Sequence, residues 1–337
     1  MWEIQQRFGL GHDALALVER AEPTPGPGQV VVRVRAASLN YRDLLTVEGS
    51  YNPKQPLPLV PLSDGSGEVA AVGPGVTRVK EGDRVAGNFA QGWVAGRPTR
   101  ERLRTTLGGP LDGMAAEQVL LDAEGVVAVP PHLSFEEAAC LPCAAVTAWN
   151  ALVSEGRLTA GETVLVLGTG GVALFALQFA HLLGARVIVT SSSDARLEKA
   201  RALGAADVVN YATTPEWDKA VKTMTGGRGA DHVLEVGGAE TLERSLRAVR
   251  FGGRVSLIGN LSGLDARLNL ALVFMRGVRL QGILVGSRRM FEAMNRAIAL
   301  HRLRPVVDRV YGFEELPEAF DRIKKQGHFG KIVLNVA

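Results

Sequence analysis

The stretch TVLVLGTGGVA, residues 163–173, decides the fold of this chain of 337 residues. A continuous apolar run leads directly into Gly168, Gly170 and Gly171, and Ala173 stands at the last glycine position of the pattern G-x-G-x-x-G/A. A helix-like segment follows at once, so the pattern lies between a strand and a helix, as its function requires. Glycine permits a tight turn and close approach of a phosphate to the backbone, and the helix N-terminus adds amide donors and partial positive charge. The stretch therefore predicts a dinucleotide-binding site.

Downstream of this stretch, strand-like and helix-like segments alternate. The helix VALFALQFAHLLG has Gly184 in place to end it, DARLEKARALG has Asp194 as its predicted N-cap, and TPEWDKAVKTMTGG has Thr214 as cap with Pro215 at its first position. The strand-like segments are RVIVTS, ADVVNY, DHVLEV, RVSLIGN and RLQGILVG. Strands that alternate with helices form a parallel sheet covered on both faces, so we predict a doubly wound α/β domain of the Rossmann type.

The first third of the chain has the pattern of a β domain. QVVVRVRAASL, residues 29–39, places Val30, Val32 and Val34 on one face of a half-buried strand. Turn signals such as PGPG, PGV and KEGD separate this strand from other short ones, which suggests a barrel or a sandwich. The final residues return to strand, helix and strand, and we expect them to rejoin this domain because chain termini often lie together.

The amino-acid composition restricts the classes of protein to which this chain can belong. Hydrophobic residues make up 46% of the chain and charged residues 22%, which suits a globular protein of two domains. The formal net charge of +3 is too small to indicate nucleic-acid binding, although it suits an anionic small ligand. We find no apolar run near the ~20 residues of a membrane span and no signal-peptide pattern, so we expect a cytoplasmic protein with no membrane partner.

The segment ARVIVTSSSDAR, residues 185–196, bears on the choice of cofactor. An NAD-dependent enzyme places a carboxylate at the end of the second strand, against the ribose 2′-hydroxyl. This chain has Ser191, Ser192 and Ser193 there, and Arg196 in the first turn of the next helix, where a cation is disfavoured unless an anion offsets it. Hydroxyls and a cation suit a 2′-phosphate, so we predict NADP(H) rather than NAD(H). The alternative is that the serines form an ordinary loop and Arg196 is solvated.

The chain has two cysteines, Cys140 and Cys143, in the sequence CLPC. A redox pair and half of a zinc site are the functional interpretations. A structural zinc usually takes four ligands, and a redox motif of this kind should follow a strand, whereas SFEEAA before it has the pattern of a capped helix. We therefore expect two small residues that pack in a core.

Several segments together resemble the medium-chain dehydrogenase/reductase superfamily over essentially the whole chain. They are AASLNYRDLL, GEVAAVGPGV, GDRV, VTAWNAL, LGTGGVA, ALGAADVVNY and GKIVL. Within the superfamily, the chain looks like the zinc-independent, quinone-oxidoreductase-like (zeta-crystallin-like) branch. The resemblance implies a GroES-like β-barrel domain at residues 1–125, completed by 288–337. It also implies a Rossmann domain at residues 126–287, with the active site in the cleft between the domains.

The resemblance also bears on zinc. Zinc alcohol dehydrogenases place a cysteine where this chain has Asn40, and their Gly-His-Glu corresponds to Leu62-Ser63-Asp64. Only Cys143 matches a cysteine ligand position, and the structural-zinc segment, near residues 88–115, contains no cysteine. Neutral amide and hydroxyl groups are not usual zinc ligands, so we expect no metal.

In the metal-free relatives, residues at the positions of Asn40 and Tyr51 line the nicotinamide and substrate pocket. Asn52 stands between Tyr51 and Pro53, where the family pattern has tyrosine directly before proline. The alternatives are a turn-stabilising role for Asn40 and loop packing for Tyr51. Trp93, in a glycine-rich segment, is expected to line the substrate pocket or to pin its loop. Positions that match the family's cofactor contacts are Thr147, Gly168, Gly170, Gly171, Val172, Tyr211, Gly237, Ile258, Asn260 and Val285.

These observations predict an NADPH-dependent reductase of quinones or α,β-unsaturated carbonyl compounds. The first alternative is an NADP-dependent alcohol dehydrogenase of the same superfamily, and the second is a non-catalytic NADPH-binding sensor protein. The segment RLQGILVG, residues 279–286, is predicted to be the edge strand of the Rossmann sheet, and we expect it to pair with its copy in a homodimer.

Overall fold

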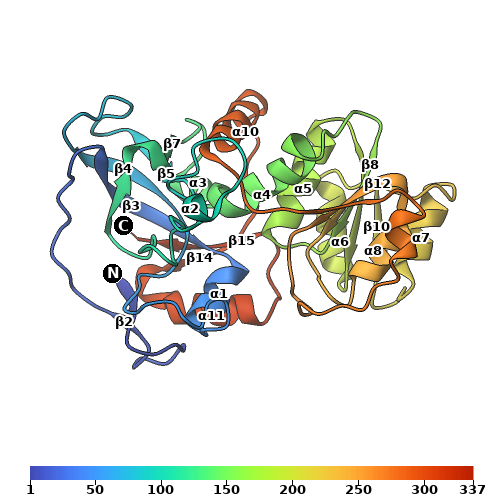
Figure 1. The fold of residues 1–337 in the computed structure, drawn as a ribbon, viewed down its shortest axis with the longest axis horizontal. Helices are drawn as coiled ribbons and strands as arrows, with labels where there is room; N and C mark the ends of the chain where they lie inside the picture. The colour runs from blue at the N-terminus through green and yellow to red at the C-terminus, as the bar shows by residue number, and fades with distance from the viewer. Residues whose placement is uncertain (337) are drawn as a thin grey trace. The chain divides into compact units, whose positions relative to one another are not determined.

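The computed structural model describes residues 1–336, which form two compact units (Figure 1). The first unit is discontinuous, because it joins Met1–Val146 to the segment that begins at Val285. The second unit is continuous and spans Thr147–Leu284. The segment 126–146, expected in the nucleotide-binding domain, belongs to the first unit, because its strand β7 (Val126–Ala128) pairs with β5 (Arg84–Gly87).

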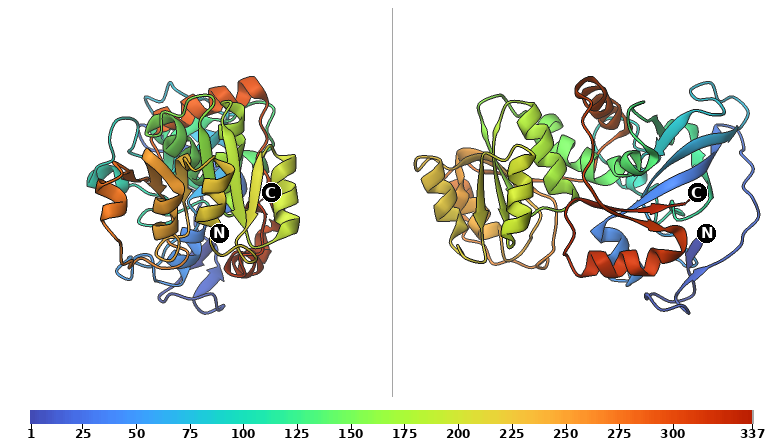
Figure 2. Two further views of the ribbon diagram at one scale, coloured as in Figure 1. Left: turned by 90° about the vertical axis from the view of Figure 1, so that its right-hand side faces the viewer. Right: turned by 180° about the vertical axis from the view of Figure 1, so that it is seen from behind.

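The second unit is built on a six-stranded parallel sheet with the order β10-β9-β8-β11-β12-β13. Counted within the unit this is 3-2-1-4-5-6, the Rossmann order. Its first strand and its fourth are buried throughout, because helices cover both faces (Figure 2). The strands are β8 (Thr163–Leu167), β9 (Arg186–Ser191), β10 (Asp207–Asn210), β11 (Ala230–Glu235), β12 (Val249–Leu257) and β13 (Arg279–Gly282).

The helices of the second unit begin close to their predicted positions, with two corrections. Gly184 follows α5 with φ +78°, as predicted for a residue that ends a helix. Asp194 is not the N-cap of α6; Ser193 is, and its Oγ accepts from the Arg196 N–H. The prediction from Thr214 and Pro215 was wrong as well, because α7 begins at Trp217. The helices are α5 (Gly171–Leu182), α6 (Asp194–Ala202), α7 (Trp217–Met224), α8 (Leu242–Ala248) and α9 (Ala271–Phe274), after α4 (Val146–Trp149) and a π-helix (Asn150–Ser154).

The first unit contains a seven-stranded sheet in which the predicted long strand is central. That strand, β3 (Gln29–Leu39), pairs antiparallel with β4, with β6 and with the C-terminal strand β15. The C-terminal segment therefore rejoins the first unit, as predicted. The path β14-β15-β3-β4-β5-β7 is made of β14 (Val307–Gly312), β15 (Lys331–Asn335), β3, β4 (Asp64–Val72), β5 and β7, with β6 (Gln118–Asp122) beside β3. A separate hairpin pairs β1 (Trp2–Ile4) with β2 (Leu15–Leu17).

The helices of the first unit are short, apart from two in the C-terminal segment. SFEEAA begins α3 as predicted, with the Ser134 Oγ accepting from the Glu137 N–H. The helices are α1 (Tyr41–Val47), α2 (Arg100–Leu103), α3 (Phe135–Ala139), a π-helix (Leu141–Ala145), α10 (Arg288–His301) and α11 (Leu316–Lys324). One contiguous core joins both ends of the chain, from Trp2 and Ile4 to Ile332 and Leu334.

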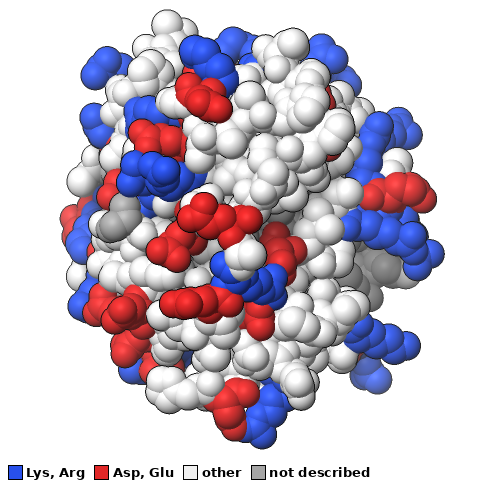
Figure 3. Space-filling model, turned by 90° about the vertical axis from the view of Figure 1, so that its left-hand side faces the viewer, with Lys and Arg blue, Asp and Glu red and all other residues white. Residues whose placement is uncertain are grey.

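The surface of the first unit carries charges of both signs. Acidic and basic side chains lie beside one another on the face drawn in Figure 3, which offers no uniformly basic area. Within residues 1–336, no helix combines the length and the hydropathy that crossing a membrane would take.

Candidate active site

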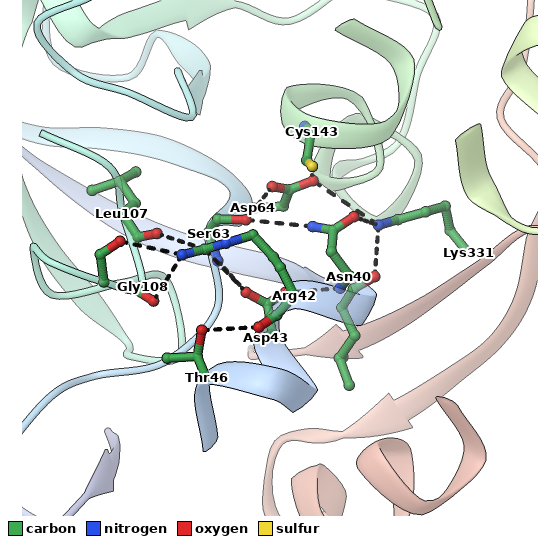
Figure 4. A network of polar contacts seen from close by, with 12 residues as sticks. Asn40, Arg42, Asp43, Thr46, Ser63, Asp64, Leu107, Gly108, Cys143 and Lys331 are labelled. Carbon is green, nitrogen blue, oxygen red and sulfur yellow. Dashed lines mark hydrogen bonds and ion pairs between the residues drawn. The ribbon is translucent and has the colours of Figure 1, made fainter. Parts of the chain in front are cut away.

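A cluster of buried and half-buried polar side chains lies where several elements of the first unit meet. Asn40 stands between β3 and α1, Asp43 lies in the first turn of α1, Ser63 and Asp64 stand at the start of β4, and Lys331 opens β15. We call these five residues the polar centre (Figure 4). Strand pairing explains how they come together, because Ser38 next to Leu39 faces Asp64 on one side and Val333 on the other.

Asp64 is fully buried and its carboxylate accepts hydrogen bonds on both oxygens. The Ser63 hydroxyl donates to Oδ1 at 2.7 Å and the Cys143 N–H donates to Oδ2 at 3.0 Å. The Lys331 Nζ lies 4.0 Å from the same Oδ2. Burial raises the pKa of Asp64, and the Lys331 ammonium opposes this rise without cancelling it.

Lys331 is only 3% exposed, so its ammonium must find partners inside the protein. It donates to the Leu39 carbonyl at 2.6 Å and to the Asn40 Oδ1 at 2.6 Å. The amide group of Asn40 is thereby fixed, with its Nδ2 directed to the Ser63 Oγ at 3.4 Å. The predicted catalytic residue Asn40 therefore lies within a connected network.

Asp43 is the second buried carboxylate of the polar centre. It accepts from the backbone N–H of Asn40 at 2.8 Å and from that of Ser63 at 3.3 Å, and it lies 3.4 Å from the Arg42 guanidinium. Burial raises the pKa of Asp43 to about 6, although Arg42 lowers it. Asp43 thus joins the start of α1 to the start of β4.

Arg42 connects the polar centre to Tyr51. Its guanidinium donates to the carbonyls of Leu107 at 3.0 Å and Gly109 at 3.2 Å. It also lies 4.9 Å from the centre of the Tyr51 ring and 5.1 Å from that of Phe89. The Tyr51 side chain is 54% exposed, so one ring face rests on a cation while much of the residue meets solvent. The ring contact is the packing that the alternative interpretation of Tyr51 expected, and it leaves part of the side chain accessible.

Two of the four side chains at the would-be zinc positions, those of Asn40 and Ser63, are not usual zinc ligands. Asn40, Ser63, Asp64 and Cys143 offer an amide, a hydroxyl, a carboxylate that is already bonded and a thiol. Burial raises the pKa of the Cys143 thiol, and the charge of Asp64 raises it further, which opposes the thiolate form that zinc needs. No group of three or more His, Cys, Asp or Glu side chains that could hold a metal occurs in the described part of the chain.

The other cysteine, Cys140, is fully buried and donates to the Glu136 carbonyl. Burial raises the pKa of its thiol to about 12. Both cysteines are free thiols. They pack within the first unit, as the expectation of two small packed residues for CLPC had it.

In the second unit, the glycine-rich loop leaves room for a phosphate. Gly168 has φ +77°, and a Cβ at this position would meet no atom within 4 Å, so the glycine is required by backbone conformation and leaves open space above it. Gly170 is the N-cap of α5 and Gly171 its first residue, which places helix amides at the loop. Val172 follows in the first turn, half-buried. These residues fit a dinucleotide pyrophosphate.

Arg196 lies beside the serines at the end of β9 and directly after it. Arg196 donates from Nη2 to the Ser192 Oγ at 3.1 Å, and the Ser193 Oγ accepts from the Arg196 N–H at 3.4 Å. The Tyr211 N–H donates to the Ser191 carbonyl at 3.0 Å, which brings the end of β10 beside this loop. The carboxylate of Asp194 accepts from Asn210 at 2.7 Å. Hydroxyls and a cation are therefore clustered at the end of the second strand, as predicted.

A buried carboxylate that the sequence interpretation missed organises the loop after β11. The Glu235 side chain is fully buried and accepts from the Gly237 N–H at 2.7 Å, the Gly238 N–H at 3.0 Å and the Thr241 hydroxyl at 2.6 Å. It also bonds the Ser245 hydroxyl. A glutamate at the end of an apolar strand, two residues before a glycine pair in the sequence VLEVGG, is the signal that could have indicated this role.

The remaining predicted cofactor contacts fall in both units. The Ile258 N–H donates to the Glu235 carbonyl at 2.9 Å, and the Asn260 carbonyl accepts from the Gly263 N–H at 3.0 Å, so both lie in the loop after β12. Thr147 is buried in α4. Val285 belongs to the first unit, where it packs against Phe89, Ala90 and Trp93.

Trp93 is 1% exposed and its Nε1 donates to the Gly96 carbonyl at 2.9 Å. This bond lies within its own loop. The indole therefore pins the loop, which is the second of the two roles expected for it.

Comparisons with known proteins agree with this architecture. The family model described as "Alcohol dehydrogenase GroES-like domain" matches residues 26–131, and the one described as "Zinc-binding dehydrogenase" matches residues 171–300. A crystal structure of a protein from Sinorhizobium meliloti 1021 is 44% identical, covers 99% of both chains and superposes with a TM-score of 0.92. A structure of an NAD-dependent alcohol dehydrogenase is 38% identical, covers 100% of both chains and has a TM-score of 0.91. The GroES-like and Rossmann assignments are thus confirmed.

Curated relatives match along nearly their whole length. The zinc-type alcohol dehydrogenase-like protein C1773.06c of Schizosaccharomyces pombe is 44% identical over 97% of this chain and 96% of its own. The acryloyl-coenzyme A reductase of Metallosphaera sedula is 31% identical, with coverage of 94% and 95%. Quinone oxidoreductase-like protein 2 of Bos taurus is 30% identical, with coverage of 95% and 89%. The similarity is thus higher to the alcohol dehydrogenase-like protein than to the quinone branch that the motifs suggested, and the chain belongs to the medium-chain dehydrogenase/reductase superfamily of NAD(P)-dependent oxidoreductases.

Proposed function

We propose that this protein is a zinc-independent, NADPH-dependent reductase of α,β-unsaturated carbonyl compounds or quinones. The observation that carries the proposal is the polar centre, in which a lysine, an amide and a hydroxyl surround Asp64 where zinc-dependent relatives have metal ligands. A bound nicotinamide cofactor supplies the hydride. Reduction of a conjugated acceptor asks little of the protein beyond stabilising a delocalised oxygen anion.

The chain offers hydrogen-bond donors for that oxygen. The Asn40 amide is held in one orientation by Lys331, so its NH2 group is preorganised. The Tyr51 hydroxyl belongs to a partly exposed side chain that rests on Arg42. We propose that these groups bind the substrate carbonyl and that the proton which completes the reduction comes from Tyr51 or from water. The relative from Metallosphaera sedula, an acryloyl-coenzyme A reductase, supports a conjugated acceptor.

The test of the proposed reaction compares two directions at one pH, well below substrate saturation. We expect a panel of enones and quinones to be reduced with NADPH much faster than simple primary alcohols are oxidised with NADP⁺. Loss of NADPH absorbance measures the first reaction and its gain measures the second. Activity that persists in a chelator would support zinc independence, whereas one tightly held zinc per chain by elemental analysis would disprove it.

Tyr51→Phe tests the donor role of the phenol. Removal of a hydrogen bond formed mainly in the transition state should lower kcat for the acceptor roughly tenfold and leave NADPH affinity nearly unchanged. Steady-state kinetics and a fluorescence titration with NADPH give the two numbers. Tyr41→Phe, on α1, is the matched control and should retain wild-type kinetics. An unchanged kcat in Tyr51→Phe would leave water as the donor.

The second candidate is an alcohol dehydrogenase. The names of the 44% identical relative and of the 38% identical structure favour it. Oxidation of an alcohol requires a group that accepts its proton, and Ser63, which donates to Asp64 at 2.7 Å, is the hydroxyl that could relay it. Robust alcohol oxidation without enone or quinone reduction, abolished in Ser63→Ala, would establish this candidate instead.

A further inference from the structure

The residues at all the would-be ligand positions are engaged by one another or by Lys331. The Asn40 Oδ1 accepts from Lys331 at 2.6 Å, its Nδ2 faces the Ser63 Oγ at 3.4 Å, and Ser63 donates to Asp64 at 2.7 Å. The backbone N–H of Cys143 donates to the other oxygen of Asp64 at 3.0 Å. The oxygens of the centre therefore already have partners within the protein.

The charges of the centre also require a cation. A buried carboxylate without a counter-charge is strongly unfavourable, and removing one member of a buried ion pair costs more than the pair contributes. Asp64 is fully buried, and its carboxylate forms an ion pair with the Lys331 Nζ at 4.0 Å. The ammonium is itself held by two oxygens at 2.6 Å, from Leu39 and Asn40. A hard, compact cation bound by oxygens thus occupies the middle of the centre.

We propose that Lys331 is a built-in cation that takes the place of a divalent metal in the polar centre and fixes the orientation of the Asn40 amide. This role of Lys331 rests on the proposed zinc independence of the protein, and it gives a physical reason for that independence. A metal would have to displace an ammonium that comes from another strand of the same sheet. It would also meet the repulsion of that ammonium at close range.

The test rebuilds a zinc site with the lysine present and absent. Asn40→Cys and Ser63→His restore ligand types that suit zinc, beside Asp64 and Cys143. Each protein is equilibrated with zinc chloride, dialysed and analysed for metal, and its affinity is measured by competition with a chromophoric chelator. We expect N40C/S63H to bind zinc weakly and N40C/S63H/K331M to bind it at least about a hundredfold more tightly, because a positive charge at short range has been removed.

The matched control is N40C/S63H/K325M, which removes an exposed lysine of the same segment. The zinc affinity of this control should equal that of N40C/S63H. Equal zinc affinity with and without Lys331 would overturn the proposal, because the ammonium would then not compete with the metal. A folded triple variant that binds no zinc would overturn it as well.

A second measurement needs no rebuilt site. Lys331→Met should lower the Tm of the protein by roughly 6 °C or more, because it leaves Asp64 buried without its cation. Asp64→Asn in the same chain should recover part of that loss, since the uncompensated charge is gone. Additive losses in the double variant would show that the two groups do not act as a pair, which contradicts the proposal. Zinc in the wild-type protein would instead overturn the proposed function itself, so the two failures are distinguishable.

Discussion

At the scale of single residues, side-chain chemistry in the sequence indicated which groups to examine but not their partners. Asn40 was singled out by its position in SLNYRD, yet its bond to Lys331 joins residues 291 positions apart. Glu235 was missed because a buried glutamate looks the same in a sequence as an exposed one. Arg196 contacts Ser192 and Ser193, because a strand end followed by a helix start fixes their spacing, and their role at a 2′-phosphate stays a prediction.

Arg196→Ala tests the proposed preference for NADPH. A charge-assisted hydrogen bond to a 2′-phosphate is worth about 1.5–3 kcal/mol, so NADPH affinity should fall roughly ten- to a hundredfold. NADH affinity should change little, since NADH has a hydroxyl in place of that phosphate. Isothermal titration with both cofactors measures the difference, and Arg201→Ala, later on the same helix, is the control. Equal losses for both cofactors would remove Arg196 from the phosphate site.

At the scale of elements, hydrophobic period and glycine placement predicted the strands and most helices, and errors fell at helix starts. Ser193 caps α6 in place of Asp194, because either side chain can cap and Asp194 instead accepts from Asn210. The helix α7 begins later than Thr214 and Pro215 suggested, since a turn follows β10. Such choices depend on neighbours from other strands, which the local sequence does not contain.

The stability of the folded protein should depend on pH through Asp43, which lies in the first turn of α1. Its pKa is raised to about 6 in the folded protein, above the ordinary value near 3.8, so the folded state binds a proton more readily than the unfolded state. Between pH 6 and pH 4 this group therefore makes the protein more stable as the pH falls, and its ionisation costs up to roughly 3 kcal/mol above pH 6.

The substitution Asp43→Asn should weaken the dependence of the protein's stability on pH. The stability of the wild-type protein relative to the variant should rise as the pH is lowered from 7 to 5, measured by urea unfolding with tryptophan fluorescence. Asp265→Asn, at an exposed position of the second unit, should leave the pH profile as it is in the wild type. Parallel profiles for wild type and Asp43→Asn would show that the carboxyl titrates normally.

At the scale of the whole molecule, the alternation of strands and helices predicted the Rossmann unit, and the motifs indicated a GroES-like domain completed by the C-terminal segment. The boundary between the units was harder to predict, because residues 126–146 continue into a helical segment without a break in composition. The identity of the substrate cannot be predicted from the fold or the motifs, because it depends on the shape of a pocket and not on the fold.

The edge of the Rossmann sheet is proposed as a dimer interface. All four residues of β13 are exposed, and exposed apolar side chains follow along this part of the chain. They are Leu261, Leu264, Leu270, Phe274, Met275, Leu280 and Leu284. An open edge strand with such neighbours favours pairing with a second copy. We expect light scattering at micromolar concentration to give a dimer, and Leu280→Lys to shift it toward the monomer; a monomeric wild type would contradict the proposal.

The discontinuity of the first unit has a consequence for synthesis of the chain. Thr147–Leu284 is one continuous segment and can fold as it leaves the ribosome. The last part of β3, from Ala36 to Leu39, must wait for β15, so that part of one edge stays unpaired while most of the protein is made, although β6 already pairs with the first part of β3. Asp64 likewise lacks the ammonium of Lys331 until the last strand arrives. A message cut short before that strand would yield a well-folded nucleotide-binding unit attached to an open, aggregation-prone sheet.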